Sequence, residues 1–211
     1  MKIAFVGYGK VGGTLATALS QIGHHVTLAS RGESSPSIQA LIAQDPTLHV
    51  APTPHAIAHA DVVFLTTPFA AARDALDAVK DQVAGKIVVD CTNPVGPGLT
   101  HGLKSVESGT ELLQKQFPTT NIVKAFTIYG YENFVAHPFP QSPLKPAMLF
   151  CGNDSAAKKV VATLIDGLGW EPIDVGAAYQ ALHLEHMTLL WVDYIRKGGH
   201  NPRFVWAAVR E

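Results

Sequence analysis

Residues 2–13 read KIAFVGYGKVGG, and this stretch decides the fold. An apolar run leads into Gly7, Gly9 and Gly12 in the pattern G-x-G-x-x-G, and a helix-like segment follows as far as Gly23. Between a strand and a helix, the first glycine permits a tight turn and the second lets the backbone approach a pyrophosphate. The third lets the helix pack closely on the strand. The stretch predicts a dinucleotide site; the alternative is a turn that is merely rich in glycine.

In such a site, the amino end of the helix faces the phosphates. Its unpaired amides and partial positive charge attract anions. We count Tyr8, Lys10 and Val11, which lie between the three glycines, among the expected cofactor contacts.

Short apolar runs alternate with helix-length segments along the rest of the chain. The expected strands are 2–7, 25–30, 48–51, 61–67, 86–93, 121–127, 147–152 and 171–176. The first expected helix ends at Gly23, and the others lie near 36–44, 69–83, 109–116, 155–167 and 177–196. Unbroken apolar strands are typical of a sheet covered on both faces, and the alternation predicts parallel βαβ units. We expect a doubly wound, mostly parallel α/β sheet of the NAD(P)-binding Rossmann type, as one domain over 1–211.

Several helix starts carry capping residues. Thr53 and Thr67 each precede a proline, Ser108 with Glu111 spells a capping box, and Asp154 precedes the helix expected near 155–167. Hydroxyl and carboxylate side chains accept hydrogen bonds from the first free amides of a helix. We expect all four to be N-caps.

Two segments near the carboxyl end stand out: residues 136–146 are rich in proline, and residues 177–211 contain an unusually apolar helix. Residues 136–146 contain four prolines, which predicts a surface loop near a pocket or a rigid connector between strands. Residues 177–211 hold an apolar helix and a tail, and such a helix needs cover. Leu182, Leu189, Leu190 and Trp191 can cover the chain's own sheet or form a homodimer interface.

Composition excludes several classes of partner. Sixteen Lys and Arg residues against seventeen Asp and Glu residues create no overall field that attracts nucleic acid or an anionic membrane. No basic leader precedes an apolar stretch, so we expect a cytoplasmic protein.

Cys91 and Cys151 lie in apolar runs without C-x-x-C spacing, which indicates buried, inert thiols. The ten histidines show no spacing with a third ligand, so we expect no metal.

The second expected strand ends in Ser30 and Arg31 instead of an acid. A carboxylate there accepts hydrogen bonds from the adenosine ribose and repels a 2′-phosphate. A hydroxyl with a planar guanidinium suits a phosphate, so the sequence predicts NADP(H) over NAD(H). The alternative is that Arg31 stacks on the adenine or is solvated. Ser34 and Ser35 are weaker candidates for the same phosphate.

Polar residues also follow the fourth and fifth expected strands, at the sheet edge where ligands of open α/β sheets bind. Thr66, Thr67 and Pro68 are expected to flank the ribose and diphosphate. Thr92, Asn93 and Pro94 are expected on the nicotinamide side. The alternative is that both stretches supply only turn and cap chemistry.

No acid–base constellation is recognisable, so no catalytic residue is assigned. Lys124 is the best candidate for a proton donor, although a lysine at a strand end more often forms a structural ion pair. Tyr129, Tyr131 and His137 are comparable candidates in the following loop.

Together these residues resemble a known family. The stretches that carry the resemblance are GYGKVGG, LASRG, VVDCTNP, SGTELLQKQFPTTNIVKAF, GYENF, CGND and NPRFVWAAVRE. They are similar to the NADP-dependent oxidoreductases that use coenzyme F420, a deazaflavin, and to the reductase part of the Steap ferric reductases. The resemblance covers nearly the whole chain.

The resemblance implies direct hydride transfer between the nicotinamide C4 and a deazaflavin ring stacked against it. Positioning then matters more than a proton shuttle. The family's phosphate contacts carry over to Ser30 and Arg31, and its nicotinamide-side loop to Asn93 and Pro94. The second ring would lie beside Ala125 and the loop after it, with the C-terminal segment as part of its wall.

One departure concerns the electron acceptor. Many family members read KAFNT after the sixth strand, whereas this chain reads KAFTIYG over 124–130. The acceptor therefore stays open among deazaflavin, FMN or FAD, a quinone and other small molecules. Two rivals also stay open: an imine or hydroxy-acid reductase that uses Lys124 or Tyr129 as proton donor, and a non-catalytic NADP sensor.

Overall fold

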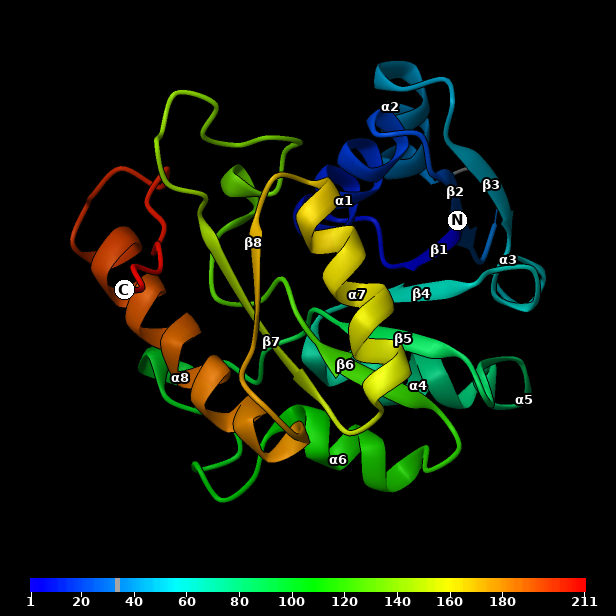
Figure 1. Cartoon of the computed structure of the whole chain (residues 1–211). Coiled ribbons are helices and arrows are strands. Elements are labelled where there is room, and N and C mark those ends of the chain that lie inside the picture. The colour runs from blue at the N-terminus through cyan, green and yellow to red at the C-terminus, as the bar shows by residue number, and fades with distance from the viewer. Residues whose placement is uncertain (33–34) are drawn as a thin grey trace.

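The computed structural model describes residues 1–32 and 35–211, and within them one sheet of eight strands carries helices on both faces (Figure 1). The strand order is β3-β2-β1-β4-β5-β6-β7-β8. The strands are β1 (Lys2–Val6), β2 (His25–Ser30), β3 (His49–Pro52), β4 (Val62–Leu65), β5 (Ile87–Asp90), β6 (Asn121–Lys124), β7 (Ala147–Gly152) and β8 (Glu171–Asp174). This order reverses direction at β1, which confirms the doubly wound Rossmann fold.

The helices lie close to the expected positions, with two differences. The helices are α1 (Lys10–Gln21), α2 (Pro36–Gln44), α3 (Thr53–Ala58), α4 (Phe69–Asp77), α5 (Lys80–Val83), α6 (Gly109–Gln116), α7 (Ser155–Gly167) and α8 (Ala181–Val192). The helix expected over 69–83 is divided, because Val79 has a non-helical backbone between α4 and α5. The last helix is also shorter than expected. A 3₁₀ turn (Ala178–Gln180) precedes α8, and a π-helical turn (Asp193–Lys197) follows it.

The last two strands, β7 and β8, run against the other six. β6 pairs with β7 in antiparallel register, with Lys124 opposite Cys151, whereas every other strand pair is parallel. Parallel neighbours need a crossover, usually a helix. The connection between β6 and β7 contains only the 3₁₀ turn Tyr131–Asn133, so β7 returns antiparallel.

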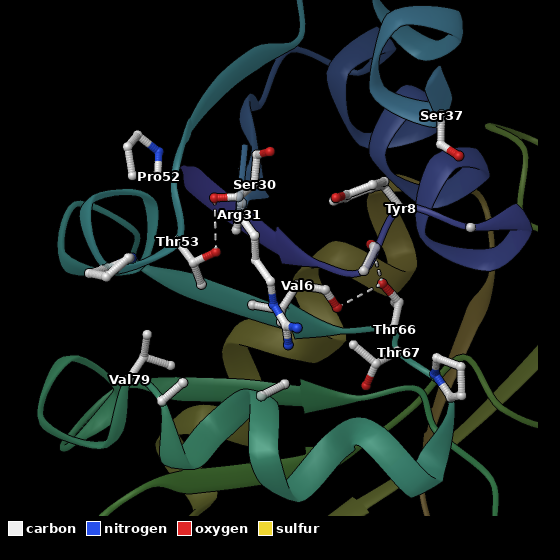
Figure 2. Close-up of a pocket in the computed structure, with 17 residues that line it drawn as sticks. Val6, Tyr8, Ser30, Arg31, Ser37, Pro52, Thr53, Thr66, Thr67 and Val79 are labelled. Carbon is white, nitrogen blue, oxygen red and sulfur yellow. Dashed lines mark hydrogen bonds between the residues drawn. The ribbon is translucent and has the colours of Figure 1, made fainter. Parts of the chain in front are cut away.

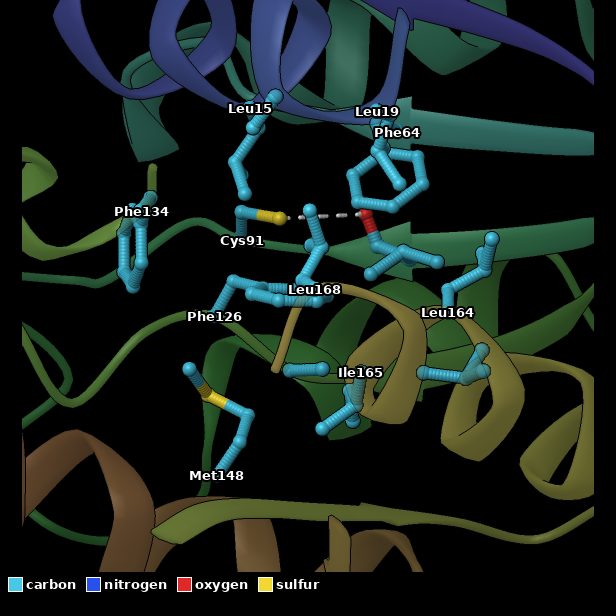
Figure 3. Close-up of a cluster of buried hydrophobic side chains, with 14 of the residues drawn as sticks. Leu15, Leu19, Phe64, Cys91, Phe126, Phe134, Met148, Leu164, Ile165 and Leu168 are labelled. Atoms are coloured by element: carbon cyan, nitrogen blue, oxygen red, sulfur yellow. Dashed lines mark hydrogen bonds between the residues drawn. The ribbon is translucent and has the colours of Figure 1, made fainter. Parts of the chain in front are cut away.

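Side chains that alternate along the strands build two cores. Ile3 and Phe5 face a cluster with α1, α7 and α8, whereas Ala4 and Val6 face a second cluster with α3, α4 and α6. Figure 3 shows the first cluster, in which Leu15 reaches down from α1 towards the sheet. Each fully buried aliphatic or aromatic side chain of this kind stabilises the fold by roughly 1.5–3 kcal/mol. Both faces of the sheet are thus covered, as the apolar strands predicted.

The α8 helix covers part of the chain's own sheet. Leu184 and Trp191 are buried within the first cluster, and the Trp191 indole N–H donates to the Phe204 carbonyl at 2.9 Å. Leu190, by contrast, is 59% exposed. The helix therefore packs on its own chain and still presents apolar side chains to the outside.

The proline-rich segment 136–146 contains no helix or strand and runs beside the C-terminal tail. The Arg203 guanidinium lies over the Phe139 ring and donates to the Pro138 carbonyl. His137 and Phe139 line a small cavity of about 220 Å³. The segment is thus a surface loop beside a small pocket.

Burial holds both cysteines in the thiol form. Cys91 and Cys151 are buried, and burial raises the pKa of Cys151 to about 12 and that of Cys91 well above its usual range. This confirms the expectation of inert thiols.

Across the described residues, we find no helix with the length and apolarity that a membrane span requires.

Two of the four expected N-caps are confirmed. Ser108 and Glu111 form the capping box of α6, in which the Ser108 hydroxyl accepts from the Glu111 amide at 3.1 Å. Asp154 caps α7 by accepting from the Ala157 amide at 2.7 Å. Both caps depend only on residues within one turn, which explains why the local sequence revealed them.

The other two were wrong. Pro52 is the N-cap of α3, so Thr53 is already helical and its hydroxyl donates to the Ser30 carbonyl at 3.2 Å. Pro68 is the N-cap of α4, which leaves Thr67 before the helix. In both helices, a proline with extended backbone occupies the capping position.

We predict that Ser108→Ala lowers the free energy of unfolding by about 1 kcal/mol, because the α6 amides lose their cap. Urea denaturation followed by circular dichroism measures this difference. Ser155→Ala is the matched control, since Ser155 is exposed at the start of α7 and the Asp154 side chain supplies that cap. Equal stability of the two variants would contradict the prediction.

Candidate functional site

The glycine turn after β1 is locked against β4. Gly7 has a φ of 101°, a conformation that favours glycine. A Cβ atom on Gly12 would collide with the Gly7 carbonyl oxygen and the Thr66 hydroxyl. That hydroxyl donates to the Gly7 carbonyl at 2.6 Å. The first and third glycines thus have the roles that the motif predicts: a tight turn and a close helix–strand approach.

A Cβ atom on Gly9 would point into open space, with no other atom within 4 Å. Gly9 is also the N-cap of α1, and no acidic side chain lies in the first turn of that helix. The α1 amides therefore face a space that suits an anion, because a helix amino end binds negative charge.

A cavity of about 740 Å³ opens at the carboxyl ends of β1, β2 and β4 (Figure 2). Its lining includes eight of the predicted cofactor residues: Gly7, Tyr8, Gly9, Ser30, Arg31, Thr66, Thr67 and Pro68. The remaining lining residues are Val6, Ala29, Ser37, Pro52, Thr53, Pro54, Ala75, Ala78 and Val79. The cavity lies at the edge where open α/β sheets bind ligands.

Arg31 gives this cavity its charge. Figure 2 shows its side chain extending into the cavity from the end of β2. Among the described lining residues there is no carboxylate, so no acidic side chain of the cavity competes with a ligand for the guanidinium. The Ser30 hydroxyl, however, donates to the Gly32 carbonyl and accepts from the Gly32 amide, so it supports the turn that carries Arg31. Ser34 lies outside the described residues, and Ser35 does not line the cavity.

The two threonines after β4 differ in their hydrogen bonding. Thr66 uses its hydroxyl to hold Gly7, as described above. The Thr67 hydroxyl oxygen is buried and has no hydrogen-bond partner among the described residues. A buried hydroxyl without a partner is costly, so Thr67 is the threonine that is available to a ligand.

Six further predicted cofactor residues do not line this cavity: Lys10, Val11, Gly12, Asn93, Pro94 and Ala125. The exposed Lys10 ammonium lies 5.1 Å from the centre of the Tyr131 ring. Val11 packs against the first core cluster. Pro94 is buried, and Asn93 is half-buried at the end of β5, the strand next to β4.

Asn93 is held by α8 and by the loop after β6. Its Oδ1 accepts from the Thr188 hydroxyl at 3.0 Å, and its Nδ2 donates to the Thr127 carbonyl at 3.4 Å. The predicted acceptor contact Ala125 is fully buried in the first core cluster, as is Phe126. Ala125 therefore exposes neither its side chain nor its backbone to an acceptor in this structure. Phe126 also has a φ of 55°, an uncommon value for a bulky residue, which turns the chain sharply after β6.

The candidate proton donors of this region are engaged elsewhere. Lys124 is fully buried, and its ammonium lies 3.3 Å from Asp90 Oδ2 and 3.0 Å from Glu185 Oε1. The Tyr129 hydroxyl donates to the Ala147 carbonyl at 2.8 Å. Burial raises the pKa of Tyr129, although a hydrogen bond from the Trp206 amide opposes this effect. Lys124 thus forms the structural ion pair that was the alternative to a catalytic role.

The remaining candidates differ in their position. Tyr131 is half-buried beside Lys10, near the start of α1. His137 is exposed in the proline-rich loop and is not part of the cavity at β1, β2 and β4.

Sequence reasoning missed three kinds of lining residue. Ser37 lies in the first turn of α2, Thr53 at the start of α3, and Ala75 and Val79 in and after α4. The proline before each of the first two was a signal, because it marks a helix amino end at the ligand edge of the sheet. The small residues of α4 gave no local signal.

Comparison with known proteins supports the family suggested by the motifs. A family model described as NADP oxidoreductase, coenzyme F420-dependent, matches residues 2–94. The F420-dependent NADP reductase of Methanocaldococcus jannaschii is 30% identical over 141 residues, which cover 63% of this chain and 60% of that protein. Metalloreductase STEAP3 of Rattus norvegicus is 28% identical over 193 residues, which cover 89% of this chain and 36% of that protein. The chain thus spans less than two thirds of these two curated relatives.

A solved structure extends the similarity to the whole chain. It comes from Arthrobacter sp. FB24 and is described as a candidate F420-dependent NADP reductase. The two chains superpose with a TM-score of 0.88 and 30% identity, and the match covers 100% of each. The chain therefore belongs to the family of coenzyme F420-dependent NADP oxidoreductases.

Proposed function

We propose that this protein transfers a hydride between NADPH and a deazaflavin or flavin-type acceptor, directly from ring to ring. The observation that carries the proposal is the burial of Lys124 and Tyr129, the two proton donors that a carbonyl or imine reductase would use here. Both are fixed by hydrogen bonds inside the protein. A site without such a donor suits a reaction that needs positioning of two rings.

The adenosine end of the cavity fits NADP(H). Arg31 supplies a planar guanidinium for the 2′-phosphate, in a cavity whose described lining contains no carboxylate. Ser37 adds a hydroxyl from the first turn of α2. The Ser30 hydroxyl contributes indirectly, since it bonds to Gly32 and so supports the backbone at Arg31.

The diphosphate fits beyond Gly9, where the space is open and α1 presents its amino end. Thr67 offers a buried hydroxyl that lacks a partner among the described residues. From there the ends of the strands continue to Asn93, whose side-chain amide is oriented by Thr188 and Thr127. We assign Asn93 and Pro94 to the nicotinamide side.

The chain's contribution to catalysis is then orientation and exclusion of water. A nicotinamide bound there would supply hydride-transfer chemistry at its C4 atom. Asn93, whose side chain is held by Thr188 and Thr127, would orient the reacting half of the nucleotide. Deazaflavin is the acceptor favoured by the family, and FMN or FAD is the second candidate.

We predict that Arg31→Ala weakens NADPH binding by about 1.5–3 kcal/mol, roughly tenfold to 150-fold, and leaves NADH binding nearly unchanged. The physical reason is the loss of a charge-assisted contact that only the 2′-phosphate makes. Calorimetric titration with both nucleotides measures the effect. Arg73→Ala is the control, because Arg73 pairs with Asp77 on exposed α4. Equal losses for NADPH and NADH would remove the 2′-phosphate assignment.

A second prediction concerns the acceptor. NADPH oxidation, followed at the nicotinamide absorbance band, should require an added deazaflavin or, less well, FMN. Turnover of an imine or hydroxy acid without any carrier would instead support the reductase rival. Nucleotide binding with no oxidation by any acceptor would support the NADP sensor.

We also propose a homodimer formed through the outer face of α8. Leu182 and Leu189 are partly exposed and Leu190 is exposed, so the helix leaves apolar surface uncovered by its own chain. We predict that sedimentation shows a dimer at micromolar concentration and that Leu190→Glu shifts it towards monomer, because the charge opposes burial. Leu144→Glu, on the exposed proline-rich loop, is the control. A monomeric unaltered chain would end this proposal.

A further inference from the structure

Four ionisable side chains are buried together at the carboxyl ends of β5 and β6. Asp90 and Lys124 are the last residues of these strands, Glu185 comes from α8, and His101 from the loop after β5. Their exposed fractions are 0%, 0%, 1% and 8%, respectively. We refer to these four residues as the buried charge cluster.

The hydrogen bonds assign the charges of the strand residues. The Lys124 ammonium has three acceptors, namely Asp90 Oδ2, Glu185 Oε1 and the Thr92 carbonyl. Asp90 Oδ1 accepts from the amide and hydroxyl of Thr92, and Oδ2 accepts from the Thr110 hydroxyl and from Lys124. Every neighbour of the Asp90 carboxylate is thus a donor, as an ionised carboxylate requires. Burial alone lowers the pKa of Lys124, but the two carboxylates raise it and the net pKa is higher than usual.

The same reasoning makes Glu185 an anion and His101 neutral. Glu185 accepts from Lys124 at 3.0 Å, from the Gly109 amide at 3.0 Å and from His101 Nε2 at 2.8 Å. His101 Nδ1 accepts from the Ser105 amide at 3.1 Å, so it carries no proton, and the single ring proton lies on Nε2. Two carboxylates against one ammonium leave the buried charge cluster with a net negative charge.

Within the described residues, the amino end of α6 compensates this charge in part, through the Gly109 amide, but no second lysine or arginine pairs with the cluster. His186, the nearest other imidazole, bonds to the Ser105 hydroxyl with its ring centre 5.3 Å from that of His101. An unpaired charge out of water is costly. A cation that binds near such a charge is therefore stabilised by electrostatic attraction.

The buried charge cluster is bonded to the turn that carries Asn93, the residue that we assign to the nicotinamide side. Lys124 donates to the Thr92 carbonyl, and the next residue is Asn93. Thr188, one turn after Glu185 in α8, bonds to the Asn93 side chain. The end of β4 lines the nucleotide cavity, and β5 is the neighbouring strand on the side away from Arg31.

We propose that the buried charge cluster makes this site favour the oxidised, cationic nicotinamide over the neutral, reduced ring. This inference rests on the proposed function. In hydride donation the C4–H bond of the nicotinamide breaks, the electron pair leaves with the hydride for the acceptor ring, and the nicotinamide gains one positive charge. A fixed negative charge in the protein beside the nicotinamide side would stabilise that product and so promote hydride donation by NADPH.

The test compares three ligands, NADP⁺, NADPH and 2′,5′-ADP, by calorimetric titration at about pH 8, where exposed imidazoles are neutral. Glu185→Gln and Asp90→Asn each remove one negative charge from the buried charge cluster, at different positions. Glu107→Gln is the matched control, because Glu107 pairs with Lys115 at the surface. The fragment 2′,5′-ADP contains only the adenosine half and reports whether that half is intact.

In the unaltered chain, NADP⁺ should bind at least as tightly as NADPH. Each cluster variant should weaken NADP⁺ relative to NADPH on the order of tenfold, the effect of one unit charge across partly screened protein. Binding of 2′,5′-ADP should stay within twofold, and Glu107→Gln should change none of the three affinities.

Three results would overturn the inference. One is tighter binding of NADPH than of NADP⁺ by the unaltered chain, which decides the question even where a variant does not fold. Another is an equal loss for NADP⁺ and NADPH, which would mean that the cluster only positions the site. A third is no change in either affinity. An unaltered chain that binds none of the three ligands would instead refute the proposed function.

Discussion

The Lys124 ammonium is the constraint around which the ligand edge of the sheet is arranged. A buried ammonium is tolerated only when charge and hydrogen bonds replace the water that it loses. Its three acceptors come from β5, from the turn after β5 and from α8. The helix is therefore docked by a directional polar contact as well as by apolar packing, and its position is tied to the strand ends.

The two halves of the site consequently rest on different supports. The half that we propose for the adenosine and diphosphate depends on the glycine turn, where Gly7, Gly12 and Thr66 close β1 against β4. The half that we propose for the nicotinamide depends on Asn93, whose turn is held by Lys124 through the Thr92 carbonyl and whose side chain is held by Thr188. The first support is local and steric, whereas the second joins segments that are far apart in the sequence.

This difference explains how much could be predicted from the sequence. The glycine motif, the Ser108 capping box and the Asp154 cap need only neighbouring residues, and all were found. Thr53 and Thr67 were misassigned because a proline took the capping position in each case. The contact between Lys124 and Glu185 gave no local signal, since a single acid in an apolar helix has no partner that the sequence identifies. Topology brings the two together only after β6 and α8 have packed.

The same buried contacts separate two kinds of reductase chemistry. A carbonyl or imine reductase must deliver a proton to its substrate, and that donor must reach the reacting atom. Here Lys124 gives all three protons to internal acceptors, and the Tyr129 hydroxyl is committed to the Ala147 carbonyl. Releasing Lys124 would deprive two buried carboxylates of their counter-charge, and releasing Tyr129 would take a donor from the Ala147 carbonyl, at a cost of roughly 1–3 kcal/mol for each group and more for a charged one. The fold thus uses Lys124 to hold the strand ends and α8 in place, which is why we propose a reaction that depends on the orientation of two rings and not on a proton donor of the protein.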